Sequence, residues 1–395
     1  MFDNQSKIKQ LISKFCPKGV IFKELGELLD YEQPGRYIVN STDYNNSFKT
    51  PVLTAGQSFI LGYTDEIEGV YYASNKKPVI IFDDFTTSFH WVDFNFKVKS
   101  SAMKLLSPKT NLDLNFRFVF YAMKCINYIP TDHARHWISQ YSKFKIPFPP
   151  VEIQNEIAKI LNSFTELEAE LEAELEARKS QYKWYRENLF LIKNDVEIKS
   201  LGEVGVFIRG NGLQKKDFTE SGIGCIHYGQ IYTYYGTFTD KTKSFVTPDL
   251  AKKLRKVKKG DVIITNTSEN LEDVGKAVVW LGEDEIVTGG HATIFKPQQV
   301  DGKYFAYYTQ TQMFFDEKRK YAKGAKVIDV SATDMSKIKI PVPSLKEQKR
   351  VASILDKFDA LVNDISIGLP AELKARRQQY EYYRNKLLTF KEYAN

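Results

Sequence analysis

The sequence has few cysteines, no long apolar run and no apolar signal core at its start. Cys16, Cys125 and Cys225 are far apart and odd in number, which favours free thiols in a reducing cytosol. No apolar run comes close to the ~20 residues that a membrane helix needs. We therefore expect a cytoplasmic protein that does not enter a membrane.

The short motifs of enzyme sites are also missing. No G-x-x-x-x-G-K-[ST] phosphate loop occurs, and the G-x-G triplets at 210–212 and 222–224 are too short for a dinucleotide fingerprint. No Asn/Asp-Pro-Pro-Tyr tetrad is present, and the cysteines and the five histidines have no zinc-binding spacing. We expect no catalytic residue, metal or cofactor on this chain.

One acidic pair could still suggest a nuclease. Asp83 and Asp84 follow an apolar run, and Lys97 and Lys99 come shortly after them. A metal-dependent nuclease would want a further acid beside such a pair. The pair followed by Phe-Thr-Thr-Ser fits a strand end and a polar loop better, so we favour a structural role.

What is present describes a globular protein of more than one domain. The 395 residues are 43% hydrophobic and 27% charged, and the net charge is +7. Residues 152–190 hold nine acidic and five basic side chains, so the rest of the chain carries +11. A polyanionic partner would therefore bind outside that segment.

The sequence contains an internal repeat. KIPFPPVEIQNEIAKILNSF begins at Lys145, and KIPVPSLKEQKRVASILDKF begins at Lys339. ARKSQYKWYRENL (from Ala177) and ARRQQYEYYRNKL (from Ala375) follow them. FKELGEL and IKSLGEV stand upstream of the two mixed blocks. Each unit is thus a Leu-Gly-Glu turn, a mixed block, a proline hinge and a long helix.

A 3,4,3,4 spacing of mainly apolar residues, with polar interruptions, predicts that the two helices pack together. The first seam is Leu161, Phe164, Glu168, Leu171, Leu175, Arg178, Tyr182, Tyr185 and Leu189. The second seam is Leu355, Phe358, Val362, Ile365 and Leu369, then Arg376, Tyr380, Tyr383 and Leu387. The second copy is four residues longer, and Pro370 cannot donate to the carbonyl of Ser366. We predict a kink or break near 368–370.

These patterns predict an α+β fold in four parts. The first mixed block with a short N-terminal helix takes residues 1–150, and the first long helix takes 151–192. The second mixed block takes 193–344, and the second long helix takes 345–391. We expect the two mixed α/β blocks to be held apart by the two long helices. These helices would form an antiparallel coiled coil with approximate two-fold symmetry.

The hinges and helix ends resemble a known family. IPFPPVEIQNEIAKIL, IPVPSLKEQKRVASIL and LPAELKARRQQYEYYRNKLL look like conserved regions of the specificity subunit of type I restriction–modification systems. The resemblance extends over the whole chain. It implies that each mixed block is a target recognition domain that reads one half of a split double-stranded DNA site. The helices would set the spacer between the halves.

The resemblance also implies partners and places the chemistry on them. Two modification subunits would dock on the hinges and helices and supply S-adenosylmethionine-dependent adenine methylation. Two restriction subunits would add ATP- and Mg-dependent translocation and cleavage. No catalytic motif is then needed on this chain.

Polar and basic side chains in the loops of the blocks are the candidates for DNA contacts. In the first block these are Arg36, Gln57, Tyr63, Lys76, Lys77, Thr86, Thr87 and Ser88. In the second block they are Arg209, Asn211, Gln214, Lys215, Lys216, His227, Tyr228, Gln230, Thr267, Ser268 and Glu269. Lys323 and Lys326 are expected to bind phosphates. Each could instead be an ordinary residue of a solvated turn.

Two other functions remain open on the sequence alone. A coiled-coil adaptor without DNA specificity would explain the helices, but not the basic remainder or the two divergent blocks. A self-sufficient nuclease–methyltransferase would need the motifs that are missing.

Overall fold

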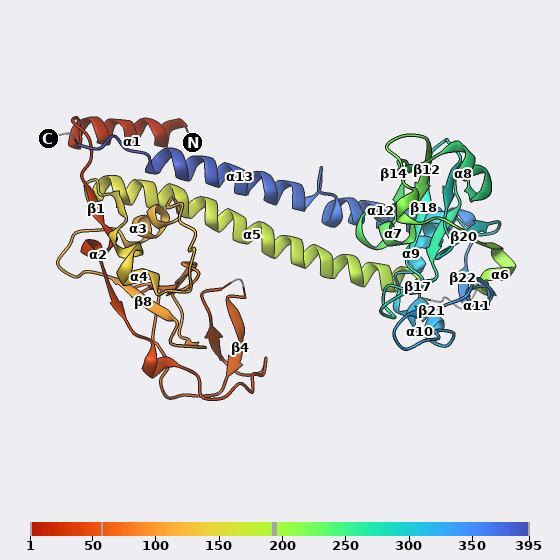
Figure 1. Cartoon of the computed structure of the whole chain (residues 1–395), viewed down its shortest axis with the longest axis horizontal. Helices are drawn as coiled ribbons and strands as arrows, with labels where there is room; N and C mark the ends of the chain where they lie inside the picture. Colours follow the sequence, from red (N-terminus) through yellow and green to blue (C-terminus); the bar gives the residue numbers. More distant parts are fainter. Residues whose placement is uncertain (1, 57, 192–195, 394–395) are drawn as a thin grey trace. The chain divides into compact units, whose positions relative to one another are not determined.

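The computed structural model describes residues 2–56, 58–191 and 196–393, with side chains from residue 7 onward. The chain forms two compact units. Unit 1 contains Met1–Leu171 and Leu373–Asn395, and unit 2 contains Glu172–Glu372. Each unit combines a mixed α/β block with part of a long helix (Figure 1). The expected α+β class with two mixed blocks is therefore confirmed.

Unit 1 has two sheets beside its hinge pair. The first has the order β2(Leu29–Glu32)-β8(Met103–Pro108)-β5(Val79–Asp83)-β6(Phe89–Val92), and the second β4(Ile60–Thr64)-β3(Thr50–Leu53)-β7(Lys97–Val98). The helices of the block are α1(Phe2–Phe15), α2(Leu25–Leu28), α3(Phe116–Met123) and α4(His136–Ser139), with short turns η1(Gly35–Tyr37) and η2(Tyr141–Lys143).

The central strand β5 is buried on both faces. Ile80 and Phe82 belong to the core that includes α3, whereas Val79 and Ile81 belong to the core under the second sheet. Successive side chains of a strand point to opposite faces, so one apolar run supplies two cores.

Unit 2 also has two main sheets. One has the order β11(Gly205–Arg209)-β20(Ala292–Pro297)-β16(Val262–Thr265)-β18(Ala277–Trp280)-β13(Phe238–Thr239), and the other β14(Ser244–Val246)-β12(Ile223–Ile226)-β19(Ile286–Thr288)-β15(Arg255–Val257). β17(Thr267–Ser268) pairs with β21(Ile328–Asp329). The helical elements are α6(Leu201–Val204), η3(Lys215–Asp217), α7(Tyr228–Thr233), α8(Pro248–Lys253), α9(Gly302–Tyr308), α10(Gln312–Arg319) and α11(Ala332–Met335). In β16, Val262 and Ile264 face one core and Ile263 the other.

Each hinge closes its unit as a two-stranded ribbon. β1(Phe22–Glu24) pairs antiparallel with β9(Lys145–Pro147), and β10(Glu197–Ser200) pairs antiparallel with β22(Lys339–Val342). The Leu-Gly-Glu turn after each leader strand packs closely on the chain before the hinge. A Cβ on Gly26 would lie 3.3 Å from Ser142 O, and one on Gly202 3.2 Å from Ser336 O. The absence of a side chain therefore permits the same close approach in both units.

The first long helix, α5(Val151–Leu189), contributes residues to both units. In unit 1, Phe164 stacks on Tyr383 of α13(Leu369–Leu388), with ring centroids 5.4 Å apart. Glu168, one turn further along α5, pairs with Arg377, which precedes Tyr383, so these segments run antiparallel (Figure 1). In unit 2, Tyr185 stacks on Phe358 of α12(Leu345–Asn363), with ring centroids 5.0 Å apart.

The second long helix is two helices rather than one kinked helix. α12(Leu345–Asn363) ends before Asp364, and α13 begins at Leu369. Pro370 lies in the first turn of α13, where its missing N–H is not needed. Asp364 Oδ1 accepts hydrogen bonds from the backbone N–H groups of Ser366 and Ile367 and so stabilises a turn. The interruption therefore lies at residues 364–368, starting a few residues before the predicted kink or break at 368–370 and overlapping it at 368.

One residue of the predicted seam is placed wrongly by the heptad pattern. Ile365 lies in this turn and is 80% exposed, instead of packing against the other helix. Val362, the previous seam position, is buried in the core of unit 2. The seam is thus interrupted where the local hydrogen bonds of Asp364 end the helix.

Candidate nucleic-acid interface

The last residue of β11 and the segment after it carry five of the predicted DNA-contacting side chains. Arg209, Asn211, Gln214, Lys215 and Lys216 are all exposed. Asn211 Nδ2 donates to the carbonyl of Lys253 at 2.8 Å, and the Gln214 N–H donates to Asp217 Oδ2 at 2.8 Å. These bonds hold the loop in one shape while its basic side chains face solvent.

The N-terminus of α7 brings His227, Tyr228 and Gln230 together. His227 is the N-cap of α7, and its Nδ1 accepts from the Gly229 N–H at 3.2 Å. Burial lowers the pKa of His227, and the charges of Lys215 and His291 lower it further. The imidazole is therefore held neutral, which an N-cap acceptor requires.

Gln230 has little freedom to read a base. Its Oε1 accepts from the His227 N–H at 3.1 Å, and its Nε2 donates to Ser244 Oγ at 2.6 Å. The side chain is also buried. Tyr228 is half-buried, and its ring lies 4.4 Å from that of His227 and 4.9 Å from that of His291.

Thr267 and Ser268 form the short strand β17, and exposed Glu269 follows it. Thr267 Oγ1 lies 3.1 Å from His291 Nδ1, and the Tyr232 hydroxyl donates to the Thr267 carbonyl. Sequence reasoning missed His291, which is exposed and follows Gly289 and Gly290 at the start of β20. The sequence signal that could have identified His291 is its place after two glycines in the turn between two expected strands.

Lys323 and Lys326 lie on the exposed loop before β21. The backbone of Lys323 is bridged to Asp329, and its Nζ lies 3.0 Å from Asp334 Oδ2. Lys337 pairs with the other oxygen at 2.8 Å. Hydrogen bonds from Lys337, Lys323 and Ser331 hold the pKa of Asp334 well below its usual range. A phosphate bound by Lys323 would therefore compete with this carboxylate.

A continuous chain of contacts joins these segments. The ring of Phe218, two residues after Lys216, lies 5.7 Å from that of His227, whose ring adjoins Tyr228 and through it His291. His291 meets Thr267, which pairs with Asp329, and Asp329 is bridged to Lys323. The N–H of Gly210, next to Arg209, donates to Ala292 O at 2.9 Å. We call the surface formed by 209–216, 227–228, 267–269, 291 and 323–326 the unit 2 face.

In unit 1, the β5–β6 turn carries Thr86, Thr87 and Ser88. Ser88 Oγ donates to the carbonyl of Ala55, and His90 Nε2 lies 3.2 Å from the Gly56 carbonyl. The end of the turn and the start of β6 thus contact residues 55 and 56. Gln57, another candidate, lies outside the described residues. Thr87 adopts φ 57° and is buried, so its hydroxyl is less accessible than that of exposed Thr86.

The other unit 1 candidates belong to separate contact groups. Arg36 is exposed, forms an ion pair with Glu32 and lies over the Tyr37 ring. Tyr63, on β4, is half-buried and pairs across to Pro51. Lys76 and Lys77 are exposed at a turn in which the Lys77 N–H donates to the Ser74 carbonyl at 2.9 Å.

The acidic pair of unit 1 is structural. Asp84 Oδ2 lies 3.0 Å from Lys104 Nζ, and both side chains are almost completely buried. Asp84 Oδ1 accepts from the Trp137 N–H at 2.9 Å. Lys97, which a nuclease site would need beside the pair, binds Glu66 at 2.7 Å instead. Within the described residues no group of three or more His, Cys, Asp or Glu is placed to hold a metal.

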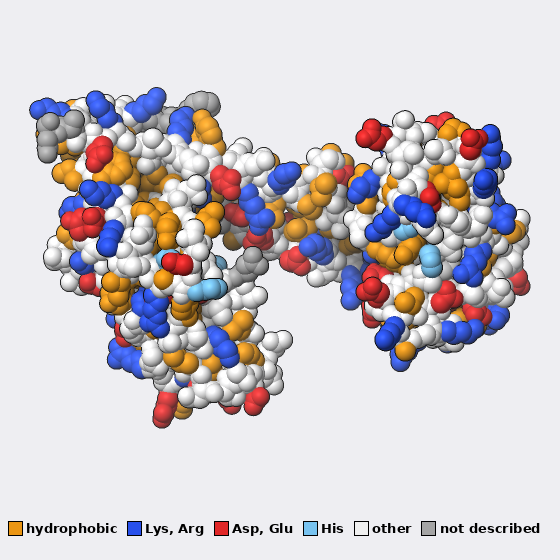
Figure 2. Space-filling model, viewed as in Figure 1, with side chains coloured by type: hydrophobic (Ala, Val, Ile, Leu, Met, Phe, Trp, Pro, Cys, Tyr) orange, Lys and Arg blue, Asp and Glu red, His pale blue; other side chains and the backbone are white. Residues whose placement is uncertain are grey.

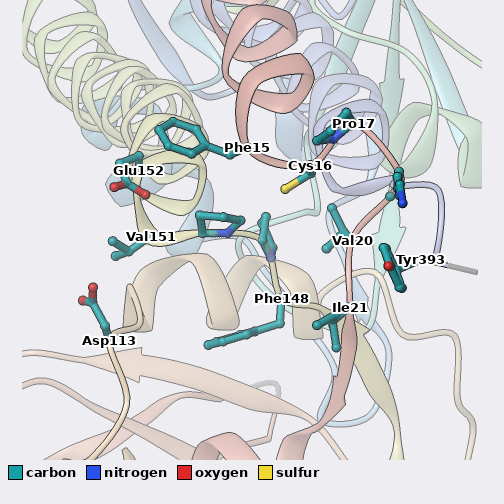
Figure 3. A pocket seen from close by; sticks show the side chains of 14 residues that line it. Phe15, Cys16, Pro17, Val20, Ile21, Asp113, Phe148, Val151, Glu152 and Tyr393 are labelled. Atoms are coloured by element: carbon teal, nitrogen blue, oxygen red, sulfur yellow. The ribbon is translucent and has the colours of Figure 1, made fainter. Parts of the chain in front are cut away.

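Each hinge also carries a pocket, which is mainly apolar in unit 1 and of mixed character in unit 2, where Ser344 and Glu347 also line it. In unit 1 the cavity of about 620 Å³ is lined by Phe15, Cys16, Val20, Ile21, Phe148 and Tyr393, among others (Figure 3). In unit 2 the cavity of about 360 Å³ is lined by Leu189, Phe190, Leu191, Tyr304, Pro341 and Pro343, among others. The two pockets use matching parts of the repeat: the hinge prolines and the end of the preceding helix.

Basic and acidic side chains are interspersed on the visible face of both units (Figure 2), so neither unit presents a uniform charge there. Figure 2 shows Lys and Arg side chains over the visible face of both units, with acidic side chains between them. Of the helices in the described part of the chain, none combines the length and the apolar character that crossing a membrane demands.

Comparison with known proteins defines the class. A family model described as "Type I restriction modification DNA specificity domain" matches residues 17–177 and again residues 193–375. The chain is thus a duplicated DNA specificity domain. It belongs to the family of type I restriction–modification specificity subunits, and the adaptor alternative is not supported.

Two curated relatives and two solved structures describe the similarity. The type I restriction enzyme EcoR124I/EcoR124II specificity subunit of Escherichia coli is 40% identical over 93% of both chains. A putative specificity subunit of Haemophilus influenzae is 30% identical over 85% of this chain and 86% of its own. The structure of the M. genitalium S subunit matches with a TM-score of 0.56 and 18% identity over 93% of this chain and 96% of that one. A second structure, described under complex assembly and conformational transition of the type I R-M system, matches with a TM-score of 0.57 and 15% sequence identity. The match covers 94% of this chain and 98% of that one.

Proposed function

We propose that the two mixed blocks read the two halves of a split double-stranded DNA site, with residues 1–150 and 193–344 as the two recognition domains. The observation that carries this proposal is the unit 2 face. Predicted candidates from four separate segments, spread over residues 209–326, lie together with His291 along one chain of contacts there. Such convergence is what a base-reading surface requires, because one groove presents only a few base edges to one block.

The side chains on this face support different roles. Arg209 and Gln214 are exposed and have the donor geometry that suits guanine and adenine edges, respectively. Lys215, Lys216 and Lys326 are exposed cations suited to phosphates. His227 and Gln230 use their polar atoms within the unit, so they shape the face rather than read bases. His291 joins the candidates for base contact.

The hinges and helices serve assembly. We propose that two modification subunits dock there, and the repeated hinge pockets support two equivalent sites. Those subunits would supply S-adenosylmethionine binding and adenine methylation, and two restriction subunits would supply ATP- and Mg-dependent cleavage. The helices would set the distance between the half-sites, and the complex would act in the cytoplasm.

A selection from random DNA tests this function. The chain, assembled with a modification subunit from the same genome, would be used to enrich binding sequences over several rounds. We expect two defined half-sites separated by a gap of fixed length and no base preference. Enrichment of one continuous motif, or of none, would refute the two-block assignment.

A further inference from the structure

Two large aromatic side chains are exposed at matching positions of the repeated helix end. Trp184 stands in YKWYRENL of α5, and Tyr382 stands in YEYYRNKL of α13. Each is 59% exposed, Trp184 in unit 2 and Tyr382 in unit 1. A single exposed ring is ordinary on a protein surface, but the same exposure at the same position of a repeat calls for a shared cause.

The packing of each unit does not require these rings. The next residue along each helix packs against the partner helix instead: Tyr185 stacks on Phe358, and Tyr383 stacks on Phe164. Adjacent residues differ by about 100° around a helix, so the preceding ring points away from the helix partner. Trp184 makes an edge contact with Tyr185 at 5.0 Å, and Tyr382 makes the same contact with Tyr383 at 5.3 Å.

The residues beside the two rings differ between the copies, but an exposed aromatic ring is present in both. The residue before each ring changes from Lys183 to Glu381, a reversal of charge, yet the aromatic character stays. A second apolar residue is also exposed in both copies. Leu167 follows Phe164 by three residues and is 43% exposed, and Leu361 follows Phe358 by three residues and is 37% exposed.

The electrostatics of the two helix ends also agree. Residues 177–190 hold four basic side chains and one acidic side chain, and residues 375–388 hold the same numbers. Ion pairs with Glu174 and Glu176 offset Arg178 and Lys179, and an ion pair with Glu168 offsets Arg377, so a smaller positive excess remains at each end. A protein surface that covers such a helix end gains from an acidic rim around an apolar centre. Tyr and Trp are the residues most enriched at the centres of protein interfaces.

We propose that Trp184 and Tyr382 are the central contacts of two equivalent docking surfaces, one in each unit, for two copies of one protein. That protein presents an apolar docking surface rimmed by Asp and Glu. The inference rests on the proposed function, in which the protein is the modification subunit. A duplicated surface on a duplicated chain fits a partner that binds twice. DNA fits less well, because stacking on an exposed ring needs an unpaired base.

Subunit stoichiometry tests the proposal. The full chain would be co-expressed with a modification subunit from the same genome, and the purified complexes would be weighed by native mass spectrometry across a dilution series. We expect two copies on the unchanged chain and one copy on Trp184→Ala or Tyr382→Ala. The double variant should bind neither copy. Each single change should lower the affinity for one copy of the modification subunit at least tenfold, as expected when an aromatic side chain at the centre of an interface is removed.

Two controls make the result interpretable. Tyr382→Phe and Trp184→Phe keep a ring and should retain two copies. Ile67→Ala removes a side chain that is more exposed still, at 84%, on the recognition block of unit 1, and should also retain two copies. Circular dichroism and melting temperature would show that the variants are folded, as expected for exposed positions.

The contradicting outcomes are distinct. If both alanine variants keep two copies with unchanged affinity, the anchors are wrong while the proposed assembly stands. If the variants keep two copies but lose DNA affinity, the rings belong to a DNA surface and the proposal is overturned. If the unchanged chain binds no modification subunit at all, the proposed assembly itself fails, and the docking surfaces fail with it.

Discussion

The backbone N–H of Asn115 donates a 2.9 Å hydrogen bond to Oε1 of Gln154, whose side chain is completely buried. Gln154 Nε2 donates in turn to the carbonyl of Pro149 at 2.7 Å. Asn115 is the N-cap of α3, so one amide ties the recognition block to the proline hinge. Gln348 makes the same two bonds in unit 2, to the Asp301 N–H at 2.7 Å and the Pro343 carbonyl at 2.8 Å.

The first prediction concerns these glutamines. Gln154→Leu should destabilise unit 1 by about 2–4 kcal/mol, because it leaves a buried donor and a buried acceptor without partners. Gln348→Leu should do the same in unit 2. Thermal unfolding followed by calorimetry, which separates transitions of different units, measures the effect. Gln378→Leu, at an exposed position of α13, is the control and should change stability by less than about 0.5 kcal/mol. Equal stability of all three variants would show that the hinge does not depend on the buried amide.

At the hinges, the sequence predicts where the long helices begin. The prolines before Val151 and Leu345 stop the helices from starting earlier, and α5 and α12 begin at those residues. The repeat itself also indicated two mixed blocks. The heptad pattern failed at Ile365, because a turn stabilised by Asp364 competes with helix there and periodicity does not report such local bonds.

The sequence predicted the kind of residue that forms the candidate site, but not which individual side chains are available to contact DNA. Polar loop residues of the second block adjoin one another through a chain of contacts, since loops at the ends of neighbouring strands are close in space. Gln230 was predicted to contact DNA, but its amide is used inside the unit. His291 was missed because its contact with Thr267 depends on the pairing of strands far apart in sequence. Thr87 was not recognisable as buried from the turn sequence alone.

A second prediction tests the shape of the unit 2 face. Gly324 has φ 105°, and a Cβ there would lie 2.0 Å from the Val327 carbonyl oxygen. Gly324→Ala should therefore displace the loop that carries Lys323 and Lys326. We expect DNA binding through the unit 2 half-site to weaken several-fold in a filter-binding or anisotropy assay. Gly236→Ala is the matched control, because its Cβ would meet nothing within 4 Å and binding should not change. Unchanged binding by Gly324→Ala would remove this loop from the interface.

A third prediction concerns pH. The pKa of His227 is lowered in the folded state, mainly by burial, so the folded chain binds fewer protons than the unfolded chain below about pH 6.5. The contribution of the neutral N-cap to stability is complete above that pH and is lost as pH falls below it. The melting temperature of unit 2 should drop between pH 7.5 and 5.5. His227→Asn keeps an N-cap acceptor that does not titrate, so its drop should be smaller. Identical pH profiles would contradict the assigned role.

A fourth prediction separates phosphate binding from base reading. Lys323→Ala removes one cation while Lys337 still pairs with Asp334. DNA affinity should fall by a similar factor for every sequence, and the slope of log affinity against log salt should decrease by about 0.9, as for one lost phosphate contact. Titrations at several salt concentrations measure it. A loss confined to one DNA sequence would instead make Lys323 a base reader.

The most direct test of the account is a methylome. The chain and its modification subunit would be expressed in a host without its own adenine methylation, and modified adenines would be mapped by long-read sequencing. The account predicts a split motif for the unchanged chain, and a motif relaxed in one half only for Arg209→Ala, with the other half and the gap unchanged. Relaxation of both halves together, or a motif without a gap, would contradict the reading of one half-site by each block.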